Sequence, residues 1–163
     1  MSQGIALEGM RLVTTYLPRA YATPDDLEAR AHMMSAAAMG ATAFQKGLGA
    51  IHAMSHPVGA VFNTHHGTTN AVCMPAVLAF NADVIRGRFD QAAAYLGIDG
   101  GFDGFCEFVQ QFNDSFAIPR TLTEMGVSTD RLDDLVAMAL EDPSCGGNPV
   151  CLLYTSPSPR DSR

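Results

Sequence analysis

The sequence has few cysteines, few basic residues and no long apolar run. Its four cysteines show no paired spacing, which argues against a disulfide framework or a cysteine-rich zinc site and is typical of a reducing cytosol. The net charge of -7 leaves no basic stripe for nucleic-acid phosphates. No stretch is apolar over the length that a membrane span needs, and the N-terminus lacks a signal-peptide pattern. We therefore expect a cytoplasmic protein that binds neither nucleic acid nor membrane.

The remaining composition is typical of a folded, helix-rich domain. Of the 163 residues, 47% are hydrophobic and 17% are charged. Apolar residues recur at helical intervals, and strands do not alternate with helices, so the sequence predicts an all-α multi-helix bundle. We expect Pro18 to end the first helix, Thr23 to cap the second, Pro57 to kink the third and Pro75 to interrupt the fourth. The predicted helices cover 4–17, 24–46, a segment around 52–56, 68–84, 88–96, 102–116 and 130–140.

The two ends of the sequence differ in character. Residues 1–150 carry the helical pattern and are predicted to form one domain. The last thirteen residues, 151–163, contain Ser-Pro twice and have no helical period or apolar face. They also resemble the translation of a transposase-type sequencing adapter. We therefore predict that 151–163 is a non-native disordered tail; a natural flexible tail is the alternative.

Four of the five histidines gather in the segment between residues 47 and 81. His52 and His56 are four residues apart, so on one helix face they lie about 6 Å from each other along the axis. His66 stands at the start of the next helix, where the intervening turn can fold it back toward His52. Two or three imidazoles among small apolar residues suit a borderline divalent metal, although they do not fill its coordination shell. On the residues alone, a metal or catalytic role and a purely structural role are equally supported.

Three other polar features have simpler explanations. His65 is adjacent to His66 and must point elsewhere, so we expect a solvent-facing loop residue. His32 lies four residues after Glu28, which predicts a helix-surface ion pair rather than a ligand pair. The acids at 25, 26 and 28 fit helix capping and need no catalytic role.

The histidine segment resembles a known family signature. The pattern G-L-G-A-I-H52-A-M-S-H56-P-V-G-A-x-x-N-T-x-H66-G-x-x-N-A-V is similar to that of the iron-containing (group III) alcohol dehydrogenases, in the dehydroquinate synthase-like fold superfamily. I118-P-x-x-L-x-x-M-G-V127 and the pair Asn148-Pro149 add to the resemblance. Members of this family have an N-terminal α/β domain for the nicotinamide cofactor and a C-terminal all-helical domain. The resemblance implies that this chain is a fragment of the helical domain, without the cofactor domain.

The resemblance also implies roles for individual histidines. His52 and His66 match two metal ligands, and His56 matches a histidine beside the metal and the nicotinamide, with a catalytic proton-relay and cofactor-binding role. The family's other two ligands are an Asp and a His four residues later, and no Asp-x-x-x-His occurs in this sequence. The implied cofactors are Fe²⁺, with Zn²⁺ as the alternative, and NAD or NADP, bound mainly by the absent N-terminal domain.

The implied activity is hydride transfer between the nicotinamide cofactor and a small primary alcohol or aldehyde, by a full-length homo-oligomer; the fragment alone is expected to be inactive. Within the family, the alternatives are reductases of the lactaldehyde, 4-hydroxybutyrate, glycerol or maleylacetate type. Outside it, the alternative is a stand-alone, non-catalytic helical metal-binding module. A zinc hydrolase ranks last, because residues 53–55 between the first two histidines include no general-base Glu.

Overall fold

The structure is a computed structural model that describes residues 1–152, and in this part of the chain it consists of helices and loops without a strand. The all-α prediction is therefore confirmed. Residues 153–163, most of the predicted tail, lie outside the described residues. The elements are α1 (Ser2–Ala22), α2 (Leu27–Ala43), η1 (Phe44–Lys46), α3 (Ala50–Phe62), α4 (His66–Leu96), α5 (Gly101–Ser115), η2 (Thr123–Met125), η3 (Thr129–Arg131), α6 (Leu132–Glu141) and η4 (Pro143–Gly147).

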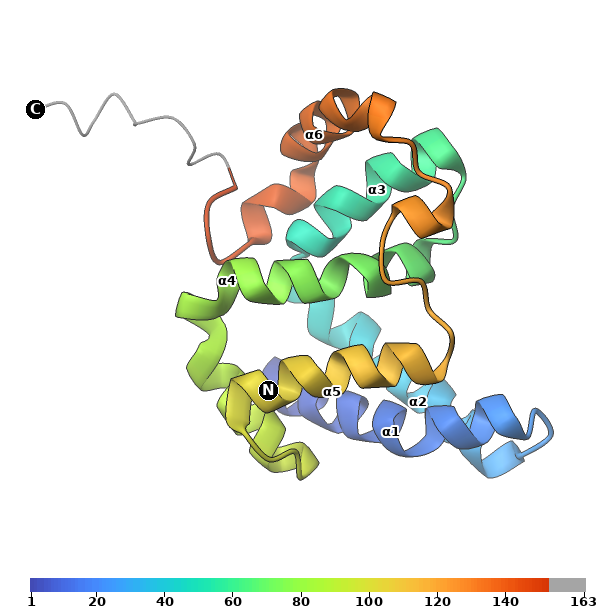
Figure 1. Cartoon of the computed structure of the whole chain (residues 1–163). Coiled ribbons are helices and arrows are strands. Elements are labelled where there is room, and N and C mark those ends of the chain that lie inside the picture. The colour runs from blue at the N-terminus through green and yellow to red at the C-terminus, as the bar shows by residue number, and fades with distance from the viewer. Residues whose placement is uncertain (153–163) are drawn as a thin grey trace, which may run out of the picture.

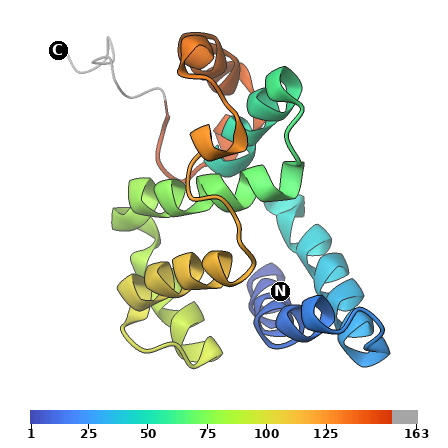
Figure 2. The same ribbon diagram turned by 45° about the vertical axis from the view of Figure 1, so that its right-hand side comes forward.

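The long helix α4 is the centre of the arrangement. Figure 1 shows α3 and α6 on one side of α4 and α5 with the α1–α2 hairpin on the other, and the turned view in Figure 2 agrees. One buried apolar cluster lies between α4 and α5, and a smaller one joins α3 to α6. Because α4 packs against both α3 and α5, it fixes α3 relative to the rest of the fold. The first cluster contains Leu78, Ile85, Ala93, Phe102, Phe105 and Val109; the second contains Val58, Val127 and Leu135.

The expected effect of the prolines on helix ends is wrong in two places. α1 continues through Pro18 to Ala22, and α4 continues through Pro75 to Leu96, so the separately predicted helix over 88–96 is part of α4. A proline removes one backbone hydrogen bond from a helix. In α4, buried side chains lie on both sides of Pro75, and this continuous packing offsets the lost bond. Pro57 likewise lies inside α3.

The segment between α1 and α2 also differs from the prediction. Thr23 follows the last turn of α1, and Asp26 caps α2, with its side chain accepting a hydrogen bond from the Ala29 N–H at 3.0 Å. Asp26 is thus a capping residue, as expected for this acidic cluster. The predicted ion pair between His32 and Glu28 is wrong: Glu28 pairs with Arg19 at 2.8 Å, and His32 stacks on Tyr16.

Among the described helices, α4 is the one that is long and apolar enough to cross a membrane. Core helices of soluble proteins meet the same criterion, and α4 packs against both α3 and α5. Its length and composition are therefore weak evidence for a span, and the absence of a membrane partner stays a prediction.

Candidate metal centre

A tight turn between α3 and α4 brings three histidines together. α3 ends at Phe62 and is followed by Asn63, whose left-handed backbone (φ 51°) reverses the chain before α4 begins at His66. Asparagine tolerates this conformation better than most residues. His66 consequently faces the preceding helix, where His52 and His56 lie one turn apart. The ring centroids are 5.3 Å apart for His52 and His66, and 5.6 Å apart for each of the other two pairs.

Two of the three rings direct the same nitrogen at one point. The side-chain nitrogen of Asn70 lies 3.1 Å from Nε2 of His66 and 3.4 Å from Nε2 of His52. Asn70 is one turn after His66 on α4, so its side chain reaches the space between the two helices. An amide nitrogen donates and does not accept, so both imidazole nitrogens present a lone pair there. The spacing of four residues between His66 and Asn70 is the sequence signal that could have identified this contact.

The third ring is held by a carboxylate that is distant in the sequence. Nδ1 of His56 lies 2.8 Å from Oδ2 of Asp142, whose side chain is 13% exposed. The other oxygen of Asp142 accepts a hydrogen bond from the Ser144 N–H at 2.7 Å and caps η4. Burial raises the pKa of Asp142, but the hydrogen bonds from Ser144 and His56 outweigh it, and the pKa is lowered overall. Asp142 therefore stays ionised beside His56.

The electrostatics of the site favour a neutral His52. Burial is the largest cause that lowers the pKa of His52, and repulsion from the charged forms of His66 and His56 lowers it further. The negative charge of Asp142 raises the pKa by a smaller amount. A neutral imidazole is the form that binds a metal. The environment of His52 therefore suits a ligand.

His65 lies at the beginning of α4 and outside the histidine triangle. Its Nδ1 accepts a hydrogen bond from the Thr68 N–H at 3.3 Å, so the side chain caps α4. The sequence predicts a solvent-facing loop residue here, and it does not predict the capping role. Histidine is an unusual cap, which is why the pattern gave no signal for one.

A buried asparagine pair holds the start of α3 against the C-terminal segment. Asn81 and Asn148 exchange hydrogen bonds of 3.0 and 2.8 Å, and the Asn148 side-chain oxygen also accepts from the Ala50 N–H at 3.2 Å. Beside this pair is a hollow of about 350 Å³ that His52 and the chain near Gly49 and Gly147 help to line. The start of α3, and so the position of His52, depends on this contact.

The donor set fits part of a metal site. Within residues 1–152, no cluster of three or more His, Cys, Asp or Glu side chains is arranged to hold a cation. His52 and His66 nevertheless offer two imidazole nitrogens directed at one point, which is the ligand chemistry that iron and zinc accept. These two residues fit as two ligands of a cation, and a complete shell requires donors from elsewhere.

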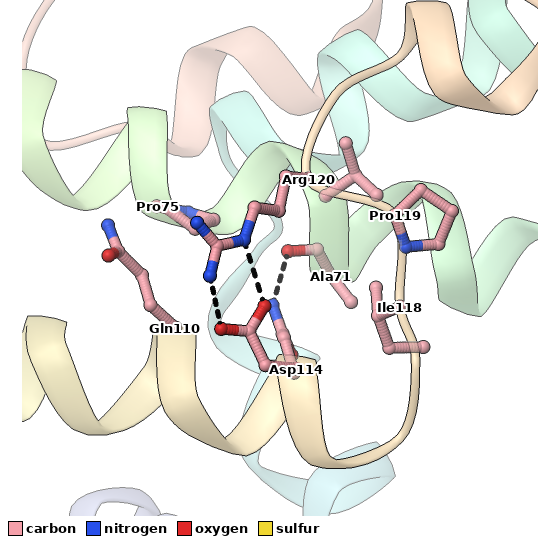
Figure 3. A pocket seen from close by; sticks show the side chains of 9 residues that line it. Ala71, Pro75, Gln110, Asp114, Ile118, Pro119 and Arg120 are labelled. Carbon is pink, nitrogen blue, oxygen red and sulfur yellow. Dashed lines mark hydrogen bonds and ion pairs between the residues drawn. The ribbon is translucent and has the colours of Figure 1, made fainter.

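Another pocket lies between the first half of α4, the end of α5 and the segment that follows α5. Figure 3 shows Arg120 and Asp114 paired at this pocket, with Pro75, Gln110 and Ile118 around them. The Arg120 Nε–H donates to Asp114 at 3.0 Å, and this hydrogen bonding lowers the pKa of Asp114. The two charges satisfy each other, so we assign the pocket no chemistry.

Comparison with known proteins shows which family the chain is similar to. The family described as "Fe-containing alcohol dehydrogenase family, C-terminal" matches residues 1–153. Over 157 aligned residues, the chain is 40% identical to a 4-hydroxybutyrate dehydrogenase of Cupriavidus necator and 36% identical to an NAD-dependent methanol dehydrogenase of Bacillus methanolicus. Each alignment covers 91% of this chain and 41% of the relative.

Solved structures agree with the sequence comparison. A 1,3-propanediol oxidoreductase superposes with a TM-score of 0.86 at 28% identity, covering 91% of this chain and 41% of that protein. An iron-containing alcohol dehydrogenase of Corynebacterium glutamicum superposes with a TM-score of 0.74 at 32% identity, covering 90% of this chain and 40% of that protein. The chain thus spans about two fifths of the length of these relatives. It belongs to the Fe-containing alcohol dehydrogenase family and corresponds to the C-terminal, all-helical domain of that family.

Proposed function

We propose that this chain is the metal-binding part of an iron-dependent alcohol dehydrogenase that transfers hydride between NAD or NADP and a small primary alcohol or aldehyde. The observation that carries the proposal is the convergence of the His52 and His66 Nε2 atoms on one point, with His56 beside them. Relatives named for 4-hydroxybutyrate and methanol, both primary alcohols, support this substrate class.

His52 and His66 would hold the cation, and its remaining ligands would come from a part of the enzyme outside this chain. When bound, divalent iron, or zinc as the alternative, supplies a Lewis acid for the substrate oxygen. The neutral state that burial gives His52 keeps its Nε2 free for this role. The small residues around the start of α3, Gly49, Ala50 and Ala53, would let a substrate and the nicotinamide approach His52 closely.

His56 would carry the proton-transfer role and contact the nicotinamide. The ionised Asp142 accepts from Nδ1 of His56, which keeps the proton on that nitrogen and leaves Nε2 to accept or release a proton. The hollow beside His52 is mainly apolar and is large enough for part of a small ligand. Most contacts to the nicotinamide cofactor would come from the part of the enzyme outside this chain.

We also propose that the whole enzyme is cytoplasmic, self-associates, and binds neither nucleic acid nor membrane. The acidic net charge supports the absence of a nucleic-acid partner. Exposed apolar side chains on α2, among them Leu27 and Met34, support self-association, because such surface is usually covered in an oligomer.

Metal analysis of three variants of the complete enzyme tests the proposal. We expect His52→Ala and His66→Ala to lose most of the bound iron and most of the alcohol oxidation, because each removes a ligand. His65→Ala is the matched control, because it removes a neighbouring imidazole that lies outside the histidine triangle. This variant should keep the iron. Equal loss of iron in all three variants would show that the assignment of ligands is wrong. The chain of 163 residues alone, supplied with ferrous iron and cofactor, should oxidise no alcohol.

A further inference from the structure

We propose that Asn70 is a positioning residue: its side-chain amide holds the Nε2 atoms of His52 and His66 unprotonated and facing one point before any cation arrives. The part of this inference that concerns metal binding rests on the proposed function. The hold on the two rings does not, because it follows from contacts within the chain.

The geometry matches two donors with two acceptors. A carboxamide nitrogen carries two hydrogens, and the Asn70 nitrogen has two imidazole nitrogens within hydrogen-bond distance, at 3.1 and 3.4 Å. Each ring can accept only if its Nε2 has no proton, so its single proton in the neutral state must be on Nδ1. Asn70 therefore selects the same tautomer in both rings, and that tautomer has the lone pair that a cation needs.

The oxygen of the Asn70 side-chain amide gains no hydrogen bond from this orientation. The Asn70 Oδ1 atom is buried and has no hydrogen-bond partner. Leaving a buried acceptor unpaired costs about 1–3 kcal/mol, so such a group calls for an explanation. The opposite orientation would place the oxygen toward the histidines and would require a proton on Nε2 of each. In the orientation that is present, the amide nitrogen lies at hydrogen-bond distance from both Nε2 atoms, although the Oδ1 atom is left without a partner.

The consequence is a prearranged ligand pair. Two imidazoles on separate helices, α3 and α4, would otherwise lose side-chain freedom and change tautomer when a cation binds. With Asn70 in place, both rings already have the required direction and protonation, and the cation replaces the amide hydrogens as the partner of the Nε2 atoms.

Nitrogen NMR of the imidazole rings tests this directly. The complete enzyme, labelled with ¹⁵N in histidine and freed of metal with a chelator, is measured at pH 8, where long-range ¹H–¹⁵N correlations show which ring nitrogen carries the proton. We expect unprotonated Nε2 atoms in His52 and His66. Asn70→Leu, which keeps the shape but removes the donors, should return at least one ring to the Nε2–H form. Asn113→Leu is the matched control, because it also removes an asparagine hydrogen bond, to the Ala71 carbonyl, without touching a histidine.

Zn²⁺ added to the same samples gives the second readout. We expect Zn²⁺ to shift Nε2 of both rings in the wild-type protein and in Asn113→Leu, because the cation replaces the amide hydrogens at these two atoms. A proton on Nε2 of either ring in the metal-free wild-type protein overturns the inference, even if Asn70→Leu does not fold. Unchanged tautomers of both rings in Asn70→Leu overturn it as well. If the tautomers are as expected but Zn²⁺ shifts neither ring, the hold of Asn70 stands and the proposed metal site fails.

Discussion

Replacing Asn148 with alanine removes the contact that ties the start of α3 to α4 and to the C-terminal segment. The Asn148 side chain exchanges two hydrogen bonds with Asn81, accepts one from the Ala50 N–H and donates one to the Val150 carbonyl. Asn81 is 4% exposed and Ala50 is 2% exposed, so neither can turn to solvent in the intact fold. The variant therefore leaves buried polar groups without partners.

The size of the loss follows from how many groups are left unpaired and how far water can reach them. The oxygen and nitrogen of the Asn81 side chain and the N–H of Ala50 each lose a partner, at a cost of about 1–3 kcal/mol per buried group. The hollow of about 350 Å³ beside them admits water, which favours the low end of this range. We therefore expect Asn148→Ala to lower the free energy of unfolding by about 3 kcal/mol.

Urea unfolding at constant protein concentration measures this loss, provided that the slope of the transition is unchanged. Asn113→Ala is the matched control, because Asn113 donates a single bond to a backbone carbonyl and should cost about 1 kcal/mol. Removing both members of the pair, Asn81→Ala with Asn148→Ala, should cost less than the sum of the single losses, because neither partner is then left alone. A loss for Asn148→Ala no larger than for Asn113→Ala, or strict additivity in the double variant, would refute this reasoning.

Two further predictions concern packing and acid stability. At Gly147 an added Cβ would overlap the backbone of the segment that leads into α3, so Gly147→Ala should lower the free energy of unfolding by about 1–3 kcal/mol. Gly146 has open space around it, so Gly146→Ala should change the free energy of unfolding by less than about 0.5 kcal/mol. Similar losses for the two variants in urea unfolding would contradict the close backbone approach at Gly147. Hydrogen bonds from Arg11 and Tyr95 lower the pKa of Glu8 from its ordinary value of 4.5 to about 2, so its contribution to stability is present above pH 4.5 and is lost as the pH falls toward 2. Glu8→Gln should therefore lose less thermal stability than the wild-type protein between pH 5 and pH 2.5, and parallel losses would contradict this sign.

The helices and the proximity of the three histidines could be predicted from patterns of neighbouring residues in the sequence. Apolar periodicity predicted the helices that became α5 and α6 to within two residues at each end. The spacing of His52 and His56, with a turn before His66, predicted that the three rings could approach each other, and the structure places them within 5.6 Å. These features depend on neighbours in the sequence, and local rules describe them well.

The errors and omissions have a common physical origin in long-range packing. Pro18 and Pro75 were expected to end or interrupt helices, because the local rule counts only the lost backbone bond. At Pro75, buried side chains on both sides of the proline offset this loss. Asp142 lies 86 residues after His56, and Asn148 lies 67 residues after Asn81. No periodicity links such pairs, so only the assembled fold reveals them. Asn70 is the exception, because its position one turn after His66 made its proximity predictable.

The most direct test of the account is an anomalous difference map recorded at the iron absorption edge from crystals of the complete enzyme. The account predicts a single peak within coordination distance of Nε2 of both His52 and His66. A peak bound to only one of these rings, or a map in which the two rings face apart with no peak between them, would contradict it.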